Sequence, residues 1–499
     1  RQAGNYSGGM PNNEFGDFQT PLALARRCLE VLALPQHGPI RVLEPTCGRG
    51  AFLRAAKERN PTSIRYGIDI NADYVQVARN YGTVAHANIF TRNLADISWP
   101  DPTAPLFVIG NPPWVTAAEL NRMESNNIPP KKNYKGMPGI AALLGSSNFD
   151  VCEYIILKAL TELRGQPLRL GMLCKTHVAR NVLVECARAR IQVATAALYP
   201  INARRWFNAE VDACWFTLTI DPALPQGNYA IDVHENLFEG AGKIARRWGV
   251  VGTTLVSDLD AYQLVRSADG PSPYTWRSGL KHDAARVFEF TSFPENLESE
   301  YVYPLLKGTD VFRGRHQHPS RWVLVPQHKF GEDTAHLQYT APKVWRYLIG
   351  HAAALDNRKS MIYRNRPRFS VFGHGDYTFA PLKVSCSGMH KESRFQLVTQ
   401  AKTPRGARPV VLDDTCYFLP FENSTHAALV TAILRSPECQ AFIQSLVFWD
   451  AKRPITKKLL SHIDLFALPC DRSTIRATAA AIAADAGVRF DADEATELF

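Results

Sequence analysis

The feature that most constrains this chain is a regular alternation of short apolar runs with amphipathic helical patterns between about residues 40 and 220. This alternation is typical of a mostly parallel β-sheet with helices on both faces, so we predict an α/β fold. The predicted strands are Ile40–Glu44, Ile64–Asp69, Val84–His86, Leu106–Gly110, Leu168–Cys174, Val193–Leu198 and Ala213–Ile220. The predicted helices are Ala51–Arg59, Ala72–Asn80, Val151–Leu163 and Val178–Ile191.

The hydrophobic pattern changes after Asp221, where irregular segments and short strand-like runs such as Trp322–Val325 replace the regular alternation. A length of 499 residues also predicts two or three domains. We therefore expect a catalytic domain over residues 1–235 and a mixed α+β domain over residues 236–499. The polar stretch Asn121–Asn148 is too long for an ordinary connection, and we interpret it as a mobile loop.

Several classes of protein are excluded by composition. No apolar run approaches the ~20 residues that span a bilayer, and the first ten residues lack the layout of a signal peptide, so we expect a cytoplasmic protein with no membrane contact. The 10 cysteines are scattered without metal-ligand spacing, which favours reduced thiols and no metal site.

Positive charge is concentrated in one segment. The whole chain carries +10, and residues 301–410 hold 18 Lys and Arg against 6 Asp and Glu, so this segment accounts for the entire excess. Between Arg358 and Phe369 the basic residues alternate with aromatic and small polar ones, which suits contacts with phosphates and bases. A solvated surface remains the alternative explanation.

The first predicted strand runs into a glycine turn, Glu44-Pro45-Thr46-Cys47-Gly48-Arg49-Gly50-Ala51-Phe52-Leu53. Glycines allow the backbone to approach a ligand closely, and the helix that follows points N–H donors into the crevice at the strand ends. Asp69 ends the next strand, where a carboxylate can accept from ribose hydroxyls. Leu53 replaces the third glycine of a dinucleotide site, which disfavours nicotinamide and flavin cofactors.

This layout resembles the S-adenosyl-L-methionine site of Rossmann-like methyltransferases. Asn88-Ile89-Phe90 falls where that family usually has Asp-Phe against the adenine ring, so Asn88 departs from the pattern. The resemblance implies a seven-stranded Rossmann-like methyltransferase domain followed by a DNA-recognition domain. The cofactor-binding residues that it implies are Thr20, Glu44, Pro45, Thr46, Cys47, Gly48, Gly50, Phe52, Asp69, Ile70, Asn88, Ile89 and Asn111.

The tetrapeptide Asn111-Pro112-Pro113-Trp114 follows the fourth predicted strand and resembles the motif of enzymes that methylate a planar exocyclic nitrogen. Such a nitrogen shares its lone pair with the ring, so the site must accept its two N–H bonds and direct the lone pair toward the methyl donor. The Asn111 side-chain carbonyl and the Pro112 backbone carbonyl can be those acceptors. Trp114 can stack on the base, and Phe207 is a second candidate for stacking.

The order of motifs resembles the gamma class of N6-adenine DNA methyltransferases from restriction–modification systems, the TaqI-like group. Phe18-Gln19-Thr20-Pro21 ahead of the cofactor strand resembles the segment that closes over the methionine end in such enzymes, and Lys175 would lie near the catalytic pocket. Adenine is favoured over cytosine because resembling N4-cytosine enzymes usually have Ser in place of Asn111. An N4-cytosine enzyme, the methyltransferase half of a combined methylase and endonuclease, a protein-glutamine methyltransferase and a non-catalytic DNA-binding protein remain alternatives.

The implied partner is double-stranded DNA, bound by a monomer, with a cognate restriction endonuclease left open as a second partner. An adenine inside a duplex cannot reach the cofactor, so the resemblance also implies that the base is extruded. The candidate DNA-binding residues are Lys131, Lys132, Lys307, Arg358, Arg364, Arg366, Arg368 and Lys452.

Overall fold

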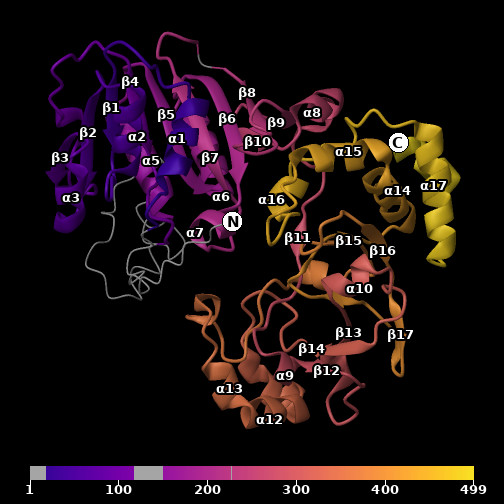
Figure 1. Cartoon of the computed structure of the whole chain (residues 1–499). Coiled ribbons are helices and arrows are strands. Elements are labelled where there is room, and N and C mark those ends of the chain that lie inside the picture. The colour runs from indigo at the N-terminus through magenta and orange to yellow at the C-terminus, as the bar shows by residue number, and fades with distance from the viewer. Residues whose placement is uncertain (1–17, 117–149, 226, 499) are drawn as a thin grey trace, which may run out of the picture. The chain divides into compact units, whose positions relative to one another are not determined.

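The computed structural model describes residues 18–116, 150–225 and 227–498, and the predicted loop 121–148 lies outside them. Its contacts divide the chain into two units at Leu259 (Figure 1). The division falls after the expected boundary at residue 235, because three further strands join the sheet of the first unit and the last two of them lie beyond that residue. These strands are β8 (Tyr229–His234), β9 (Ile244–Val251) and β10 (Thr254–Val256).

The first unit contains all seven predicted strands. They are β1 (Arg41–Glu44), β2 (Ile64–Asp69), β3 (Thr83–His86), β4 (Leu106–Gly110), β5 (Leu168–Lys175), β6 (Val193–Ile201) and β7 (Ala213–Ile220). Their order is β6-β7-β5-β4-β1-β2-β3, parallel throughout except at β7, which is antiparallel to both β5 and β6. The expected Rossmann-like sheet is therefore confirmed, and β8, β9 and β10 extend it beyond β6 to ten strands.

Helices alternate with these strands as predicted. The four predicted helices are α2 (Ala51–Arg59), α3 (Ala72–Ala78), α5 (Val151–Glu162) and α6 (Thr176–Arg188), and a further helix, α1 (Leu22–Val31), precedes β1. A short helix that the sequence pattern did not reveal, α7 (Ala203–Phe207), lies between β6 and β7. At five residues it is too short to show a helical period.

One aromatic pair sets the packing between α2 and the sheet. Phe52 of α2 stacks on Trp215 of β7, with ring centroids 5.5 Å apart and planes 13° apart, and both side chains are fully buried. Gly171 of β5 makes room for the indole, because a Cβ at that position would lie 2.3 Å from Trp215 Cζ2. The same core holds Trp114 and Phe207.

The second unit is a mixed α+β domain, as expected. One sheet has the order β11 (Arg277–Ser278), β20 (Cys416–Phe421), β15 (Leu382–Ser387) and β16 (Phe395–Val398). Another has the order β12 (Glu289–Phe290), β14 (Arg321–Leu324), β13 (Val302–Leu306) and β19 (Val411–Leu412). β17 (Ala401–Thr403) and β18 (Gly406–Arg408) form a separate hairpin.

Helices of the second unit form two groups in the sequence. The earlier group consists of α8 (Leu259–Val265), α9 (Ala285–Phe288), α10 (Gly308–Phe312), α11 (Leu337–Thr340), α12 (Pro342–Gly350) and α13 (Ala352–Asp356). The later group consists of α14 (Ser424–Arg435), α15 (Pro437–Leu446), α16 (Lys457–Leu460), α17 (Arg472–Asp485) and α18 (Ala492–Leu498). Among the described residues, no helix is long and apolar enough to cross a membrane.

Candidate active site

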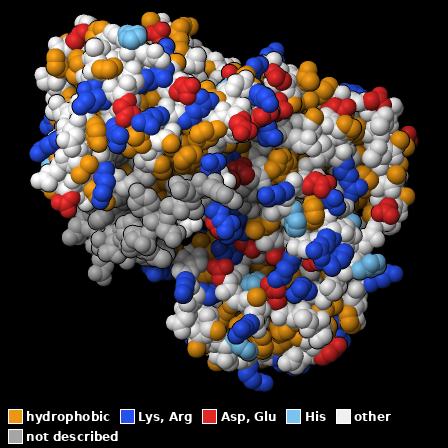
Figure 2. Space-filling model, in the orientation of Figure 1, with side chains coloured by type: hydrophobic (Ala, Val, Ile, Leu, Met, Phe, Trp, Pro, Cys, Tyr) orange, Lys and Arg blue, Asp and Glu red, His pale blue; other side chains and the backbone are white. Residues whose placement is uncertain are grey.

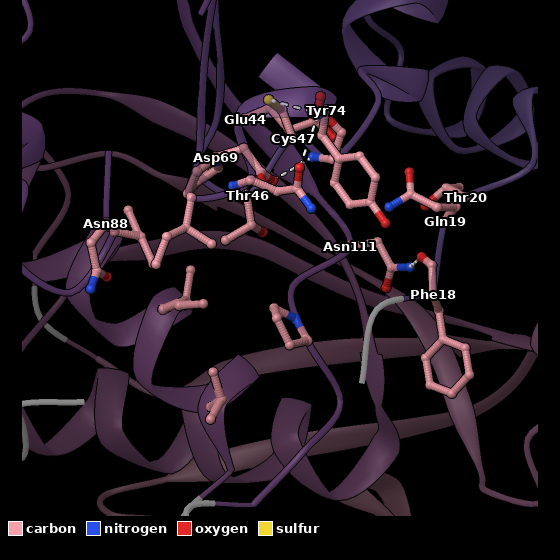
Figure 3. Close-up of a pocket in the computed structure, with 18 of the residues that line it drawn as sticks. Phe18, Gln19, Thr20, Glu44, Thr46, Cys47, Asp69, Tyr74, Asn88 and Asn111 are labelled. Atoms are coloured by element: carbon pink, nitrogen blue, oxygen red, sulfur yellow. Dashed lines mark hydrogen bonds between the residues drawn. The ribbon is translucent and has the colours of Figure 1, made fainter. Parts of the chain in front are cut away.

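A cavity of about 350 Å³ lies where the carboxyl ends of β1, β2, β3 and β4 meet (Figure 3). Pockets of a few hundred Å³ at this edge of a parallel sheet are the usual ligand sites of such folds. Eleven of the thirteen residues predicted to bind the cofactor line it, namely Thr20, Glu44, Pro45, Thr46, Cys47, Gly48, Asp69, Ile70, Asn88, Ile89 and Asn111.

The other two predicted residues, Gly50 and Phe52, do not line the cavity. Gly50 begins α2 with φ +81°, and a Cβ there would lie 3.0 Å from Ala78 Cβ of α3. Phe52 is buried against Trp215. Both residues therefore shape the turn by packing beneath it, and a direct contact with a ligand is not supported by their positions.

The glycine turn after β1 is fixed by Asp69. Gly48 has φ +49°, and its backbone N–H donates to Asp69 Oδ2 at 2.8 Å. The other oxygen, Asp69 Oδ1, accepts from the Asn71 backbone N–H at 2.8 Å. A Cβ at Gly48 would lie 2.9 Å from the amide end of the Gln19 side chain, and the positive φ also favours glycine at this position. Asp69 thus couples the β1 turn to the β2 turn across the cavity.

The interior side of the cavity is poorly solvated. Burial raises the pKa of the Glu44 carboxyl well above its ordinary value, against one backbone hydrogen bond from Leu53, and the nearby Asp69 charge adds to the increase. Burial and the same two carboxyls raise the pKa of the Cys47 thiol. Cys47 is therefore held as a neutral thiol rather than as a nucleophilic thiolate.

Two buried polar atoms at the cavity have no hydrogen-bond partner among the described residues: Thr46 Oγ1 and Asn111 Oδ1. Buried polar groups are nearly always paired in folded proteins, so unpaired atoms beside a cavity indicate that a ligand supplies the partner. Together with the carboxylate of Asp69 they suit a ligand with both hydroxyl and amino groups. The residues present therefore fit a nucleoside cofactor and an amino-bearing substrate.

Asn111 is oriented by a residue far away in the sequence. Its Nδ2 donates to the backbone carbonyl of Phe18 at 3.0 Å (Figure 3). Because a backbone carbonyl can only accept, the amide nitrogen faces Phe18, and Oδ1 is left as the free acceptor. Pro112 is buried and Pro113 lines the cavity, so the predicted tetrapeptide forms part of the wall.

Trp114 and Phe207, the two residues predicted to stack on a base, contact each other edge to face. Their ring centroids are 5.1 Å apart with planes at 70°, and the Phe18 ring is 5.6 Å from each of them. Trp114 Nε1 donates to the Leu173 carbonyl at 3.2 Å, and only 5% of the residue is exposed. The three rings form a closed cluster beside Asn111.

Helix α5 adds residues to the site that the sequence did not indicate. Val151 and Ile155 line the cavity, and Val151 N–H donates to the Val115 carbonyl at 2.9 Å, which joins the start of α5 to the Asn111 segment. The helix is capped by Asp150, whose Oδ2 pairs with Lys175 Nζ at 3.0 Å. Lys175, predicted near the pocket, does not line the cavity and contacts Asp150 at the start of the helix that does.

The remaining lining residues come from segments that flank the predicted ones, namely Phe18, Gln19, Ala51, Asn71, Tyr74, Ala87, Phe90 and Pro113. Tyr74 carries the clearest missed signal. It lies in the first turn of α3, just after the Asp69 strand end, where the side chain of a helix can lean over a ligand.

The candidate DNA-binding residues are not equivalent in the structure. Arg358 donates to the carbonyls of Leu355, His282 and Ser370, so it links three backbone segments within the second unit. Its Nε and Nη1 groups are therefore used within the protein, and the DNA contact predicted for Arg358 stays a prediction. Arg368 pairs with Asp356 at 2.7 Å, and Lys307 pairs with Glu289 at 2.7 Å.

Arg364 and Lys452 are exposed, Arg366 is half-buried against aromatic rings, and Lys131 and Lys132 lie outside the described residues. In the described part of the chain, no group of three His, Cys, Asp or Glu side chains could hold a metal ion.

A similar protein is Type II methyltransferase M.NspV from Nostoc sp., which is 35% identical over 471 residues. The alignment covers 91% of this chain and 96% of that protein. The chain belongs to the Type II methyltransferase family. No family model matches the sequence.

Solved structures show weaker likenesses to this Type II methyltransferase. A methyltransferase subunit of a type I restriction–modification system from Streptococcus thermophilus is 17% identical, with 44% of this chain and 48% of that chain covered and a TM-score of 0.31. The type IIG restriction endonuclease BpuSI is 12% identical, with 95% and 60% covered and a TM-score of 0.36. The chain spans about half the length of the Streptococcus protein and less than two thirds of BpuSI, and both TM-scores are low.

Family membership settles the class of reaction. The protein is a restriction–modification methyltransferase, and its cofactor is S-adenosyl-L-methionine. The cavity that holds Asp69, Thr46 and Gly48 has the place in the fold and the polar groups that this cofactor requires.

Proposed function

We propose that this protein transfers a methyl group from S-adenosylmethionine to the N6 amino group of adenine in duplex DNA, in a specific sequence and as part of a restriction–modification system. The observation that carries the proposal is the free, buried carbonyl of Asn111 at the cavity wall. A planar amino nitrogen has two N–H bonds to donate, and an amide oxygen fixed beside the cofactor cavity is a suitable acceptor for one of them.

The residues of this chain orient the target nitrogen and place hydrogen-bond acceptors beside it. The cofactor, when bound, supplies an electrophilic methyl group on a sulfonium. Asn111 Oδ1 accepts one N–H of the target, the Pro112 carbonyl accepts the other, and both bonds draw the nitrogen lone pair out of conjugation with the ring. The proline pair fixes the two carbonyls in one turn, so orientation is set before the substrate arrives. Asp69 holds the glycine turn in place for the cofactor.

Extrusion of the adenine would place it against the aromatic cluster of Phe18, Trp114 and Phe207. Because Trp114 is 5% exposed, a base can stack on its face only if a neighbouring ring moves. Phe18 is the ring that contacts both of the others, and its backbone already holds Asn111. Base entry is therefore expected to displace the Phe18 ring while its carbonyl stays bonded to Asn111.

The decisive experiment measures transfer of labelled methyl from S-adenosylmethionine to mixed-sequence duplex DNA, followed by digestion to nucleosides. The expected product is N6-methyladenine. Asn111→Ala should lose ~100- to 1,000-fold in rate, by analogy with removal of one preorganised hydrogen-bonding group in other active sites, while cofactor binding measured by calorimetry persists. Asn80→Ala is the matched control, since Asn80 is an exposed residue outside the cavity.

Other outcomes have distinct meanings. Label on the N4 position of cytosine would refute adenine as the target and leave the methyltransferase assignment intact. Cofactor binding without any label on DNA would refute the DNA substrate. Label retained by Asn111→Ala would refute the role of this carbonyl.

A further inference from the structure

Two phenylalanines and one arginine form an exposed platform in the second unit. The Arg366 guanidinium carbon lies 4.5 Å from the centre of the Phe330 ring and 5.9 Å from that of Phe372. Phe330 is 61% exposed and Phe372 is 37% exposed. Among the described residues, Arg366 has no recorded carboxylate or carbonyl partner, unlike Arg358 and Arg368.

The loops that carry the platform are tied together by a buried glutamine. Gln327 is 1% exposed; its Oε1 accepts from the Val371 N–H at 3.0 Å, and its Nε2 donates to the Glu332 carbonyl at 2.6 Å. Phe372 and Lys281 exchange both backbone hydrogen bonds at 2.8 Å. The platform residues therefore project from a fixed base.

The surroundings suit a polyanionic partner. Lys and Arg side chains are scattered among hydrophobic ones over the visible face of this unit (Figure 2). The platform lies within residues 301–410, which carry 18 basic and 6 acidic residues. A single exposed apolar side chain needs no explanation, but two phenylalanine rings that both lie close to one arginine form an organised surface.

We propose that the Phe330–Arg366–Phe372 platform reads a guanine in the DNA sequence that this enzyme recognises, with Arg366 donating to guanine O6 and N7 in the major groove. The inference rests on the proposed DNA substrate and assigns one specificity-determining residue. A guanidinium that lies on an aromatic ring is held in one plane, while the N–H groups at its edge remain free for a bidentate pair. Phe330 presents an apolar surface for an adjacent thymine methyl or sugar.

A phosphate contact is a poorer explanation for this geometry. A phosphate can accept one or two N–H bonds from an arginine in many orientations, so it does not require a guanidinium that is held in one plane, and the exposed Arg364 suits such a contact. Fixing the plane of a guanidinium on an aromatic ring matters where the two acceptors lie in one fixed plane, as O6 and N7 of guanine do.

The test compares Arg366→Lys and Arg366→Ala with Arg346→Ala, an exposed arginine of α12 that has no recorded ring partner. The methylated sequence of the unaltered enzyme is first mapped on mixed-sequence DNA. Discrimination is then measured as the ratio of kcat/KM for duplexes with the mapped site and with each guanine replaced in turn. Anisotropy with the same duplexes measures binding independently of methyl transfer.

Arg366→Lys keeps the charge and loses the bidentate pair, so discrimination at one guanine should fall by about 5- to 150-fold, the range expected for one such contact. Arg366→Ala should lose the same discrimination, and Phe330→Ala should lose part of it. Arg346→Ala should retain it. Unfolding temperature and S-adenosylmethionine binding should match those of the unaltered enzyme in every variant, which separates recognition from folding.

Two results would overturn the inference. The first is a loss that is equal on all sequences, with unchanged discrimination and a smaller salt dependence, since that is the behaviour of a phosphate contact. The second is unchanged discrimination and unchanged binding in both Arg366 variants. If the unaltered enzyme binds duplex DNA and transfers no methyl, the proposed function fails. Its binding sequence is then selected from a pool of random duplexes, and anisotropy ratios on that sequence decide whether Arg366 reads guanine.

Discussion

Replacing Lys175 with methionine should destabilise the first unit strongly, because it leaves the buried carboxylate of Asp150 without its ion-pair partner. Asp150 is 2% exposed, its Oδ1 accepts from the Cys152 N–H at 3.0 Å, and its Oδ2 pairs with Lys175 Nζ at 3.0 Å. His177 is the other titratable group nearby, at 4.0 Å. Breaking a buried ion pair by removing one partner costs ~3–5 kcal/mol, which corresponds to about 6–20 °C in unfolding temperature for a unit of this size.

The destabilisation should depend on pH with a definite sign. Burial raises the pKa of Asp150 above its ordinary value even in the presence of Lys175, whose charge opposes the shift. Without Lys175 the pKa rises further. A carboxyl with a higher pKa in the folded than in the unfolded state takes up a proton on folding, so stability increases as pH falls through the folded pKa. The loss in Lys175→Met should therefore be largest near pH 8 and should shrink on acidification.

Thermal unfolding between pH 5 and pH 8 measures this effect, and the double variant Asp150→Asn with Lys175→Met is its control. A neutral amide can still accept from the Cys152 N–H, so the double variant should recover most of the lost stability. Cofactor affinity should follow the same order, because Asp150 begins the helix whose Val151 and Ile155 line the cavity. The reasoning is refuted if Lys175→Met unfolds at the same temperature as the unaltered protein at pH 8, or if the double variant is no more stable than the single one.

Three further changes test other parts of the structure. Gly171→Ala places a Cβ 2.3 Å from the Trp215 ring and should cost ~1–3 kcal/mol in urea unfolding; an unchanged midpoint would show that the core adapts. Glu44→Gln removes a carboxyl whose pKa burial raises, so its unfolding temperature should exceed that of the unaltered protein at pH 8, with a gap that closes as pH falls. In the second unit, burial opposes ionisation of Glu289, but hydrogen bonds from His282 and Lys307 outweigh it and lower its pKa to about 2. Stability there should fall as pH drops from about 4 toward 2, and calorimetry of Glu289→Gln should show lower stability at neutral pH without this acid step.

The catalytic fold could be predicted because its signals are local. Short apolar runs mark strands directly in the sequence, and β2, β4 and β7 begin and end at the residues predicted for them. The strands that were missed, β8 to β10, depend on a pairing that no local pattern encodes: β8 joins the sheet by pairing with β6 in parallel, and β9 then pairs with β8.

The difference between local signals and long-range contacts also applies to the charged residues. A run such as Arg364, Arg366 and Arg368 looks uniform in the sequence, yet the fold places Arg368 beside Asp356 and Arg366 near the rings of two phenylalanines. Charge is a property of the residue, whereas the availability of that charge to a ligand depends on which partners the fold brings within reach. Prediction of the basic segment was therefore possible, and prediction of its individual contacts was not.

Asn111 combines a local sequence signal with a contact that only the fold creates. The strand end, the proline pair and the aromatic residue mark it as a hydrogen-bonding group at a ligand site, and all of these signals lie within five residues. Which end of its amide faces the ligand is set by the carbonyl of Phe18, which lies 93 residues earlier. Because the proposed reaction needs an acceptor, and the opposite orientation would present a donor, the chemistry of the tetrapeptide is completed by a residue outside it. A search for the tetrapeptide alone would therefore find the site without showing whether its key oxygen is available.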